Sequence, residues 1–270
     1  MAPKAAGEQC RAVLAAREIR AQLNRFEAAG SRTAYYQADI RDARSVAEAV
    51  EKITKELGPV RGLVHGAGVL ADKLIQDKTA EQFDLVFDTK VAGLRNVLAA
   101  LDLAQLRVLA LYSSPTARFG RVGQCDYAMA NEALNKTAAL CARRLPDCRV
   151  VSFNWGPWDG GMVNDGLKAL FAKEGVGVIG LQEGGRFLVD ELASASQAVG
   201  GPGFSLLVAA VLGIGLLADA RRVTVLGALL LGAPAAQPVL TCAAEELGST
   251  RPRSSRWPIG SPASRSCSPS

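Results

Sequence analysis

Three side chains from separate stretches of this sequence could together protonate a carbonyl oxygen. Ser114 follows an apolar run at residues 106–112, and Tyr127 lies a short distance further along. A hydroxyl can hydrogen-bond a substrate oxygen while a phenol gives up its proton, but a phenol has a pKa of about 10. A nearby ammonium lowers that pKa, and Lys90 could supply it. The plain alternative is a surface lysine and a half-buried tyrosine packed for its area.

A fourth polar side chain, Asn131, shares a helix face with Tyr127. The two residues are separated by four positions in a stretch with helical spacing at residues 125–144. Side chains four positions apart lie on one face of a helix, so both are expected to point the same way. These residues form one site only if the elements that carry them meet.

The elements that must position these side chains follow two alternating periodicities up to about residue 195. Helical spacing is predicted at residues 8–29, 42–57, 79–101, 125–144, 162–173 and 183–194, and strands at 33–38, 60–65, 106–112 and 149–154. Alternating strands and helices predict an α/β fold with a Rossmann-like, doubly wound parallel sheet. Ligands of such sheets bind at the carboxyl ends of the strands, so the residues after each strand are candidates.

Two further strand ends carry candidate residues. Asp39 and Ile40 follow the strand at 33–38, where a carboxylate could accept a hydrogen bond from an adenine amine or simply cap the next helix. Gly66 and Ala67 follow the strand at 60–65, and small residues allow close approach of a ligand. His65, the single histidine, could be a general base, but its place favours backbone positioning of a cofactor.

Taken together, these residues resemble the ketoreductase (KR) domains of modular polyketide and polyunsaturated fatty-acid synthases, a branch of the short-chain dehydrogenase/reductase superfamily. The resemblance covers about residues 8–195 and is carried by HGAGVL (65–70), LYSS (111–114), GQCDYAMAN (123–131) and NWGPWDGGMV (154–163). In the wider superfamily a lysine follows the tyrosine by four positions and an asparagine lies on the preceding helix. Lys90 and Asn131 show the exchanged arrangement of the synthase ketoreductases.

The resemblance implies a role for each catalytic candidate. Tyr127 would be the general acid, and Ser114 would hydrogen-bond the ketone oxygen. Lys90 would lower the pKa of Tyr127 and contact the nicotinamide ribose, and Asn131 would order the groups that resupply the proton. The substrate would be a β-ketoacyl thioester on the phosphopantetheine arm of an acyl carrier protein, with other synthase domains or chains as partners.

The same resemblance implies NADPH as the cofactor and no metal. The residues that would contact NADPH, beyond Lys90 and Tyr127, are Asp39 and Ile40 at the adenine, His65, Gly66 and Ala67 at the adenosine ribose, and Gly156, Pro157 and Trp158 beside the nicotinamide. Residues 162–174 would form a lid over the substrate arm. Leu70-Ala71-Asp72 partly matches a Leu-Asp-Asp motif, and Phe119 stands where the other product class has tryptophan, which favours a D-3-hydroxy product.

One expected feature of the family is not found at the start of this sequence. Members begin with a strand and a Gly-x-x-x-Gly-x-Gly turn that binds the pyrophosphate, and nothing in residues 1–30 resembles it. The first β-α-β portion is therefore predicted to be absent. Its two strands would be central in the sheet, so apolar faces would be exposed. The chain by itself is expected to bind NADPH poorly.

Three segments follow from these patterns. Residues 1–195 form the truncated ketoreductase domain, residues 196–248 an apolar extension (a last strand plus a helix, or less favoured, a membrane-associating hairpin), and residues 249–270 a disordered Ser/Pro/Arg tail. The apolar runs at 206–218 and 223–233 are shorter than the ~18–20 residues that span a bilayer. The tail also resembles translation in a shifted reading frame.

Composition narrows the function classes. The net charge of +5 gives little support for nucleic-acid binding, and one histidine without a Cys-x-x-Cys pair argues against zinc. Scattered cysteines without a secretory signal favour a reducing, cytoplasmic location. The leading hypothesis is an NADPH-dependent ketoreductase of polyketide or fatty-acid biosynthesis. The alternative is an inactive gene fragment or non-catalytic remnant of a synthase module that does not bind NADPH on its own.

Overall fold

The computed structural model describes residues 3–160, 163, 165–193, 204–210 and 224–231. Its helices and strands, in chain order, are α1 Pro3–Ala28, β1 Arg32–Ala38, α2 Ala43–Leu57, β2 Gly62–Gly66, the 3-10 turn η1 Ile75–Asp77, α3 Ala80–Ala100, β3 Val108–Ser113, α4 Thr116–Phe119, α5 Cys125–Arg144, β4 Arg149–Asn154, α6 Asp165–Lys173, α7 Leu181–Ala193, β5 Phe204–Ala210 and β6 Thr224–Leu231. The expected tail at 249–270 lies outside the described residues. Of the elements before β5, only α4 and η1 were not expected, because neither is long enough to show a periodicity.

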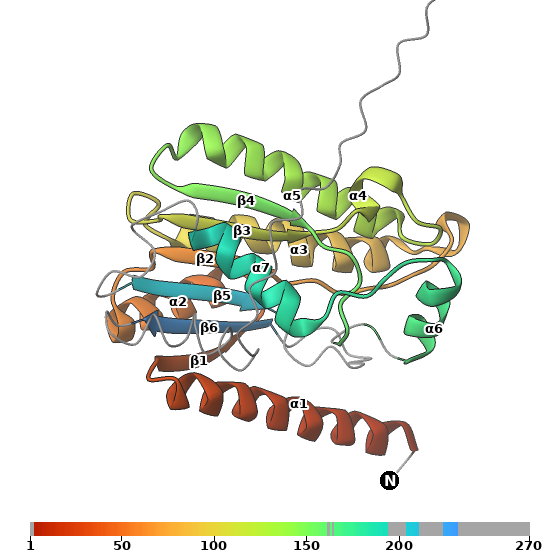
Figure 1. Cartoon of the computed structure of the whole chain (residues 1–270), viewed down its shortest axis with the longest axis horizontal. Helices are drawn as coiled ribbons and strands as arrows, with labels where there is room; N and C mark the ends of the chain where they lie inside the picture. Colours follow the sequence, from red (N-terminus) through yellow and green to blue (C-terminus); the bar gives the residue numbers. More distant parts are fainter. Residues whose placement is uncertain (1–2, 161–162, 164, 194–203, 211–223, 232–270) are drawn as a thin grey trace, which may run out of the picture.

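A six-stranded sheet runs through the centre of the molecule in the order β1-β6-β5-β2-β3-β4. Strands β5, β2, β3 and β4 are mutually parallel, whereas β6 is antiparallel to both β1 and β5. Five strands therefore point the same way, and their carboxyl ends lie along one edge of the sheet (Figure 1). The predicted Rossmann-like, doubly wound fold is confirmed, with β6 as the strand that departs from a wholly parallel sheet.

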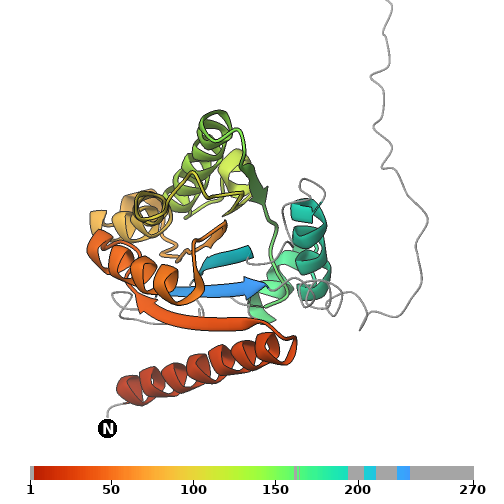
Figure 2. The same ribbon diagram turned by 90° about the vertical axis from the view of Figure 1, so that its left-hand side faces the viewer.

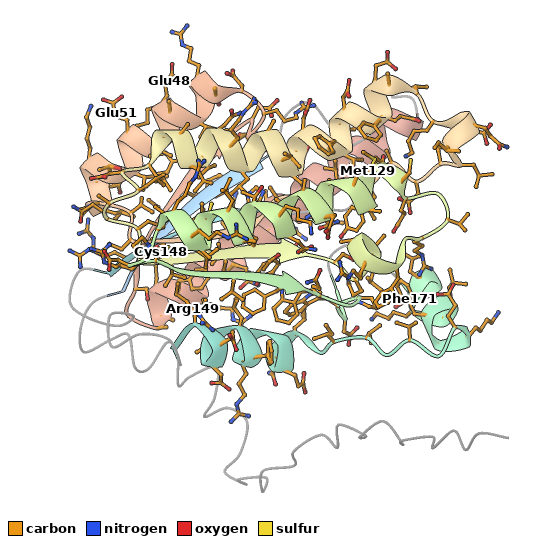
Figure 3. The ribbon with its side chains drawn as sticks, turned by 90° about the horizontal axis from the view of Figure 1, so that it is seen from above. Glu48, Glu51, Met129, Cys148, Arg149 and Phe171 are labelled. Atoms are coloured by element: carbon orange, nitrogen blue, oxygen red, sulfur yellow. The ribbon has the colours of Figure 1, made fainter. Side chains whose placement is uncertain are left out.

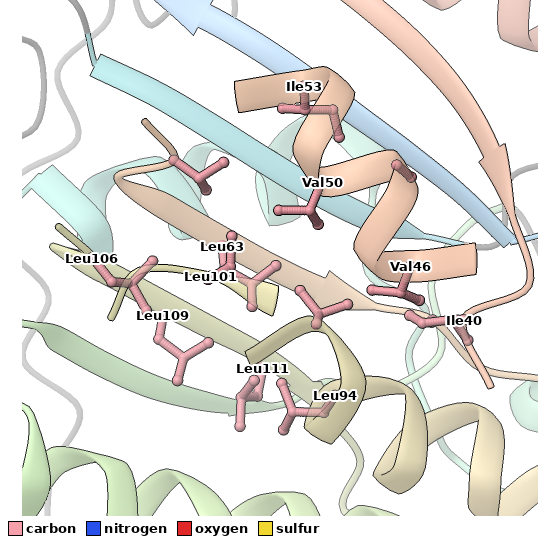
Figure 4. Packing of buried hydrophobic residues seen from close by; sticks show 14 of the residues in the cluster. Ile40, Val46, Val50, Ile53, Leu63, Leu94, Leu101, Leu106, Leu109 and Leu111 are labelled. Carbon is pink, nitrogen blue, oxygen red and sulfur yellow. The ribbon is translucent and has the colours of Figure 1, made fainter. Parts of the chain in front are cut away.

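Helices cover both faces of the sheet. Helices α2, α3 and α5 lie on one face and α7 lies on the other (Figure 2). Strands β2 and β3 are buried on both sides, because alternate residues face opposite layers. Leu63, Leu109 and Leu111 pack against the layer of α2 and α3 (Figure 4), whereas Val64 and Ala110 belong to the cluster that includes α7.

The centre of the sheet corrects one expectation. Loss of two central strands was expected to leave apolar faces exposed, but β6 and β5 fill the positions between β1 and β2. β5 pairs in parallel with β2 from Gly62↔Leu206 to Gly66↔Ala210, and β6 pairs along the whole of β1. Two apolar runs thus supply the backbone partners that β1 and β2 need, because unpaired buried N–H and C=O groups are costly.

The apolar extension therefore contributes two strands to the sheet. A last strand plus a helix was expected within residues 196–248, and both parts of it that the structure describes are strands. How the chain divides into domains stays a prediction. Within the described residues, none of the helices combines the length and apolar character needed to cross a membrane.

Candidate active site

Ser114 and Tyr127 meet at the carboxyl end of β3. Ser114 directly follows the strand and is buried, with its Oγ 3.1 Å from Thr116 Oγ1 and accepting from the Thr116 amide at 3.2 Å. Tyr127 lies in the first turn of α5, and its phenol shares a hydrogen bond with the Ser114 side chain. The expected pairing of a hydroxyl and a phenol is present in the structure.

Lys90 reaches the same place from α3. Its side chain is buried, and its Nζ donates to the carbonyl oxygen of Tyr112 at 2.9 Å and lies 5.5 Å from the centre of the Tyr127 ring. Gly68 makes room for this side chain, since a Cβ there would lie 3.0 Å from Lys90 Cε. The alternative of a surface lysine is therefore wrong.

Burial has the largest influence on the pKa of Tyr127. It raises that pKa, and the neighbouring Asp72 adds to the rise, whereas a lowering of the pKa by Lys90 stays a prediction. Hydrogen bonds to Asn131 and Ser114 act in the opposite direction without cancelling the effect of burial. Burial also lowers the pKa of Lys90 to about 8. At neutral pH the phenol is protonated, which is the form that a proton donor needs.

Asn131 is fully buried on the same helix as Tyr127. Its side-chain Nδ2 donates to the backbone carbonyl oxygen of Tyr127 at 2.8 Å. The backbone carbonyl oxygen of Asn131 accepts from Ser113 Oγ at 3.2 Å. Its Oδ1 is buried with no hydrogen-bond partner within the part of the chain that the structure describes. Such an oxygen is a ready acceptor for a water or a ligand group.

The adenosine-side candidates are only partly placed as expected. Asp39 is not the cap of α2, because Asp42 holds that position, and its carboxylate accepts instead from Arg41 Nε at 3.2 Å and Nη2 at 3.0 Å. Ile40 is fully buried in the hydrophobic core (Figure 4), and a Cβ on Gly93 of α3 would lie 2.9 Å from its Cγ2. The Ile40 side chain is therefore a core group, and Asp39 is the residue of the pair that could meet a ligand.

His65 lies within β2 rather than at the start of a turn. Its ring is fully buried, and its Nε2 is 2.9 Å from the carbonyl oxygen of Lys90. Burial and the positive charge of Lys90 lower the pKa of His65 to about 3, so the ring is neutral. A buried neutral ring that holds the backbone of α3 does not support the general-base alternative. Ala67 is also fully buried, which leaves Gly66 as the more accessible of the neighbouring candidates.

Gly156, Pro157 and Trp158 follow β4 at the same edge of the sheet. The Pro157 carbonyl accepts from Ile179 N at 2.7 Å, and Trp158 stacks on Tyr112 with 6.4 Å between the ring centres. Tyr112 is also the residue whose carbonyl holds Lys90. Tyr112 therefore contacts both Trp158, in the expected nicotinamide border, and Lys90.

Part of the expected lid also contacts this edge. Helix α6 carries Phe171, at one end of the molecule (Figure 3), and the guanidinium of Arg121 lies 5.1 Å from the centre of that ring. Arg121 also pairs with Glu174 at 3.2 Å. Arg121 precedes α5, so the two contacts join α6 to the segment that leads into Tyr127.

Sequence reasoning missed one buried ion pair beside the site. Lys78, from the loop after β2, pairs with Asp126, the neighbour of Tyr127, at 2.7 Å. Asp126 lies within the GQCDYAMAN stretch, but Lys78 carries no pattern that separates it from a surface lysine. Among the described residues there is no group of three or more His, Cys, Asp or Glu side chains placed to hold a metal ion.

A serine at a strand end, with a tyrosine and a lysine that reach it from two helices of a doubly wound sheet, is the arrangement of the short-chain dehydrogenase/reductase class. Residues 9–160 match the family model of the KR domain, and this chain therefore belongs to the KR domain family. These residues include every catalytic and cofactor candidate named above.

Comparison with individual proteins agrees with this family. The chain is 43% identical over 196 residues to one component of the polyunsaturated fatty acid synthase of Thraustochytrium sp., an alignment that covers 72% of this chain and 7% of that protein. A ketoreductase from the first module of phoslactomycin biosynthesis in Streptomyces sp. HK803 superposes with a TM-score of 0.52 at 29% identity, over 60% of this chain and 36% of that one. A ketoreductase domain from the bacillaene assembly line gives a TM-score of 0.53 at 25% identity, over 75% and 44%. The chain thus spans a small part of the relatives that it matches.

Proposed function

We propose that this chain carries the proton-transfer site of a ketoreductase that reduces a β-ketoacyl thioester to the β-hydroxyacyl thioester in polyketide or fatty-acid biosynthesis. The observation that carries the proposal is the meeting of Ser114, Tyr127 and Lys90 from three separate elements. A packed core has no need of a phenol, a hydroxyl and an ammonium at one strand end, and the burial of an ammonium is costly. Chemistry at a carbonyl oxygen explains all three groups.

In this mechanism Tyr127 donates the proton. Its pKa is raised by burial, so the phenol holds its proton until charge develops on the substrate oxygen. The Ser114 hydroxyl, which is already oriented by Thr116, hydrogen-bonds the same oxygen and stabilises the developing alkoxide. The buried ammonium of Lys90 then favours the phenolate left behind on Tyr127. The Oδ1 of Asn131, which has no hydrogen-bond partner among the described residues, offers an acceptor for the water that would resupply the proton.

The residues present fit the nicotinamide half of NADPH better than the adenosine half. Lys90 and Tyr127 would hold the nicotinamide ribose, Gly156 and Trp158 would border the ring, and Asp39 would accept from the adenine amine. When bound, the reduced nicotinamide supplies the hydride. Gly68 leaves the space in which Lys90 lies, so this part of the site is already shaped around the ammonium. In the described part of the chain, no strand passes directly through a glycine-rich turn into a helix.

The proposed substrate is an acyl chain on the phosphopantetheine arm of an acyl carrier protein, and other synthase domains or chains are the proposed partners. The loop after β2 exposes Leu74 and Ile75, which suits contact with an acyl chain rather than a charged metabolite. On the same loop Asp72 accepts from Gln124 at 2.8 Å, three residues before Tyr127. By its resemblance to the Leu-Asp-Asp motif, the Leu70-Ala71-Asp72 segment favours a D-3-hydroxy product.

A second candidate is a non-catalytic remnant that does not bind NADPH by itself. It is favoured by the central sheet positions, which β5 and β6 fill with strands that follow β4 in the sequence. In this case the polar cluster would be intact but would lack a bound cofactor. Equilibrium titration of the purified chain with NADPH, followed by cofactor fluorescence, tests it directly. A dissociation constant in the low micromolar range would exclude the remnant.

The ketoreductase proposal is tested by NADPH oxidation with a β-ketoacyl N-acetylcysteamine thioester, followed at 340 nm. Tyr127→Phe should lower the rate by about 10²-fold or more, because it removes only the donated proton. Tyr35→Phe, which removes a hydroxyl on β1 far along the chain from the site, is the matched control and should keep the wild-type rate. An equal rate with and without the Tyr127 hydroxyl would contradict the proposal that this chain is a ketoreductase.

A further inference from the structure

The loop after β2 is joined to the start of α5 by a buried ion pair. Lys78 Nζ lies 2.7 Å from Asp126 Oδ2, and the two side chains are 4% and 1% exposed. The same Nζ donates to the carbonyl oxygen of Ala71 at 2.7 Å, so one ammonium holds both its own loop and the helix. In contrast, the pair of Lys136 and Glu132 on α5 is largely exposed at the lysine.

Asp126 divides its carboxylate between the loop and the catalytic tyrosine. While Oδ2 holds Lys78, Oδ1 accepts a hydrogen bond from the backbone N–H of Tyr127 at 2.9 Å. The first turn of a helix has free N–H groups and favours negative charge, so the carboxylate is well placed there. The position of the Tyr127 backbone thus depends on the same group that anchors Lys78.

Two further hydrogen bonds join the same loop to the residues that lead into α5. Asp72 Oδ2 accepts from Gln124 Nε2 at 2.8 Å, and the backbone N–H of Lys73 donates to the Gly123 carbonyl at 3.0 Å. All of these groups on the helix side lie within the four residues before Tyr127. Residues 71–78 and 123–127 are therefore held together by side chains and backbone at once.

Such a pair is poorly explained as a stabilising device alone. Removing two charges from water carries a large desolvation penalty, and apolar side chains of similar volume often do as well or better. A buried pair does fix relative positions, because breaking it leaves one charge without a partner. What this pair fixes is the distance between the exposed apolar loop and the phenol.

We propose that Lys78 and Asp126 are a positioning pair that couples the loop at residues 71–78 to Tyr127, so that the segment facing the acyl chain and the acid occupy one fixed arrangement. The role of Tyr127 as acid rests on the proposed function above, whereas the coupling itself does not. The pair acts through Tyr127 and does not touch the reacting atoms.

Amide hydrogen exchange tests the coupling without any need for activity. In Lys78→Met, exchange of the Tyr127 and Lys73 amides should rise together by at least about tenfold, while amides of β3 stay protected. Lys136→Met, the same substitution at the exposed pair on α5, should leave the Tyr127 amide unchanged. Unchanged exchange at Tyr127 in Lys78→Met would overturn the proposal, and so would an equal rise across β3, which would indicate general loosening.

A double-mutant cycle adds a second measurement. Asp126→Asn keeps an acceptor for the Tyr127 amide and removes the charge. In the double variant Lys78→Met/Asp126→Asn no carboxylate is left unpaired. The Tyr127 amide should therefore exchange more slowly in the double variant than in Lys78→Met. Strictly additive effects would contradict the coupling.

In the reductase assay Lys78→Met should lower kcat about tenfold with KM within about threefold, since misplacement by a fraction of an ångström acts on the reacting geometry. If wild type shows no Tyr127-dependent rate, the proposed function fails, and hydrogen exchange still decides the coupling.

Discussion

The proposed proton-transfer side and the proposed adenosine side of this sheet edge are built in different ways. Lys90, Ser114 and Asn131 come from three separate stretches of the chain and are all buried. Lys90 donates to the carbonyl oxygen of Tyr112 on β3, and the backbone carbonyl oxygen of Asn131 accepts from Ser113 at the end of that strand. Asp39 keeps a side chain that is 30% exposed and pairs with Arg41, two residues away. The first arrangement is fixed before any ligand arrives, whereas the second has to exchange a protein partner for a ligand.

This difference teaches where rigidity is needed. A proton donor must be held close to its final geometry, because small displacements reduce the rate steeply. An adenine contact adds affinity and tolerates adjustment. The backbone of the adenosine side is nevertheless anchored, since Asn96 of α3 donates to the carbonyl oxygens of Ile40 and Arg41 at 3.0 Å.

The largest effect on the proposed proton-transfer side is expected from Lys90→Met. Loss of the ammonium removes the charge that favours the phenolate of Tyr127, and the reductase rate should fall by about 10²-fold. The variant should remain folded, because a methionine keeps most of the buried volume. Steady-state kinetics together with circular dichroism check this, and a folded variant with the wild-type rate would place Lys90 outside the machinery.

The same lysine predicts a pH dependence. Its pKa of about 8 in the folded chain means that the ammonium is largely present at pH 7 and is lost as the pH rises through 8. The rate should therefore decline by up to about tenfold per pH unit above 8. A rate profile from pH 6 to 10 measures it, and a flat profile up to pH 10 would contradict a role for the charged form.

His65 contacts the backbone carbonyl oxygen of Lys90, and it predicts a pH dependence of stability. Its pKa is about 3 when folded and about 6.5 when unfolded, so the unfolded chain binds more protons between these values and stability falls as the pH drops through this range. At pH 5 the loss is about 2 kcal/mol relative to pH 7. Urea unfolding at both pH values should show a smaller loss in His65→Gln. Equal losses in the two proteins would assign the acid sensitivity to other groups.

Gly93 of α3 packs against Ile40, and this contact joins the helix that carries Lys90 to the segment after β1. A Cβ at this position would lie 2.9 Å from Ile40 Cγ2, so Gly93→Ala should lower the free energy of unfolding by about 1–3 kcal/mol. Gly185 in α7 has open space around it, and Gly185→Ala should raise the same quantity by about 0.5–1 kcal/mol. Chemical denaturation compares them, and opposite signs are the expected result.

The smallest effect is expected on the adenosine side. Arg41→Gln removes the cation that pairs with Asp39, which frees the carboxylate for an adenine amine and should tighten NADPH binding by about two- to fivefold. Arg44→Gln, at an exposed pair on α2, is the control with no expected change. Fluorescence titration measures both, and weaker binding in Arg41→Gln would assign Arg41 itself to the cofactor.

Local patterns were enough to predict most elements and several site residues. Helix α5 and strand β4 begin and end where the periodicity predicts, and the stretches around Ser114, Tyr127 and Asn131 identify the family. These features depend on side-chain alternation and on short spacings, which are properties of neighbouring residues. The family and the parallel direction of β2, β3 and β4 could therefore be predicted from the sequence.

Other features depended on groups that meet only in the folded chain. The sequence predicted neither the insertion of β6 and β5 between β1 and β2, nor the pairing of Lys78 with Asp126, nor the burial that raises the pKa of Tyr127. Sheet order is set by which strands find backbone partners, and a pKa is set by how much water remains around a group. The sequence by itself determined the residue types and the elements that carry them, and the tertiary structure decided their partners and their burial.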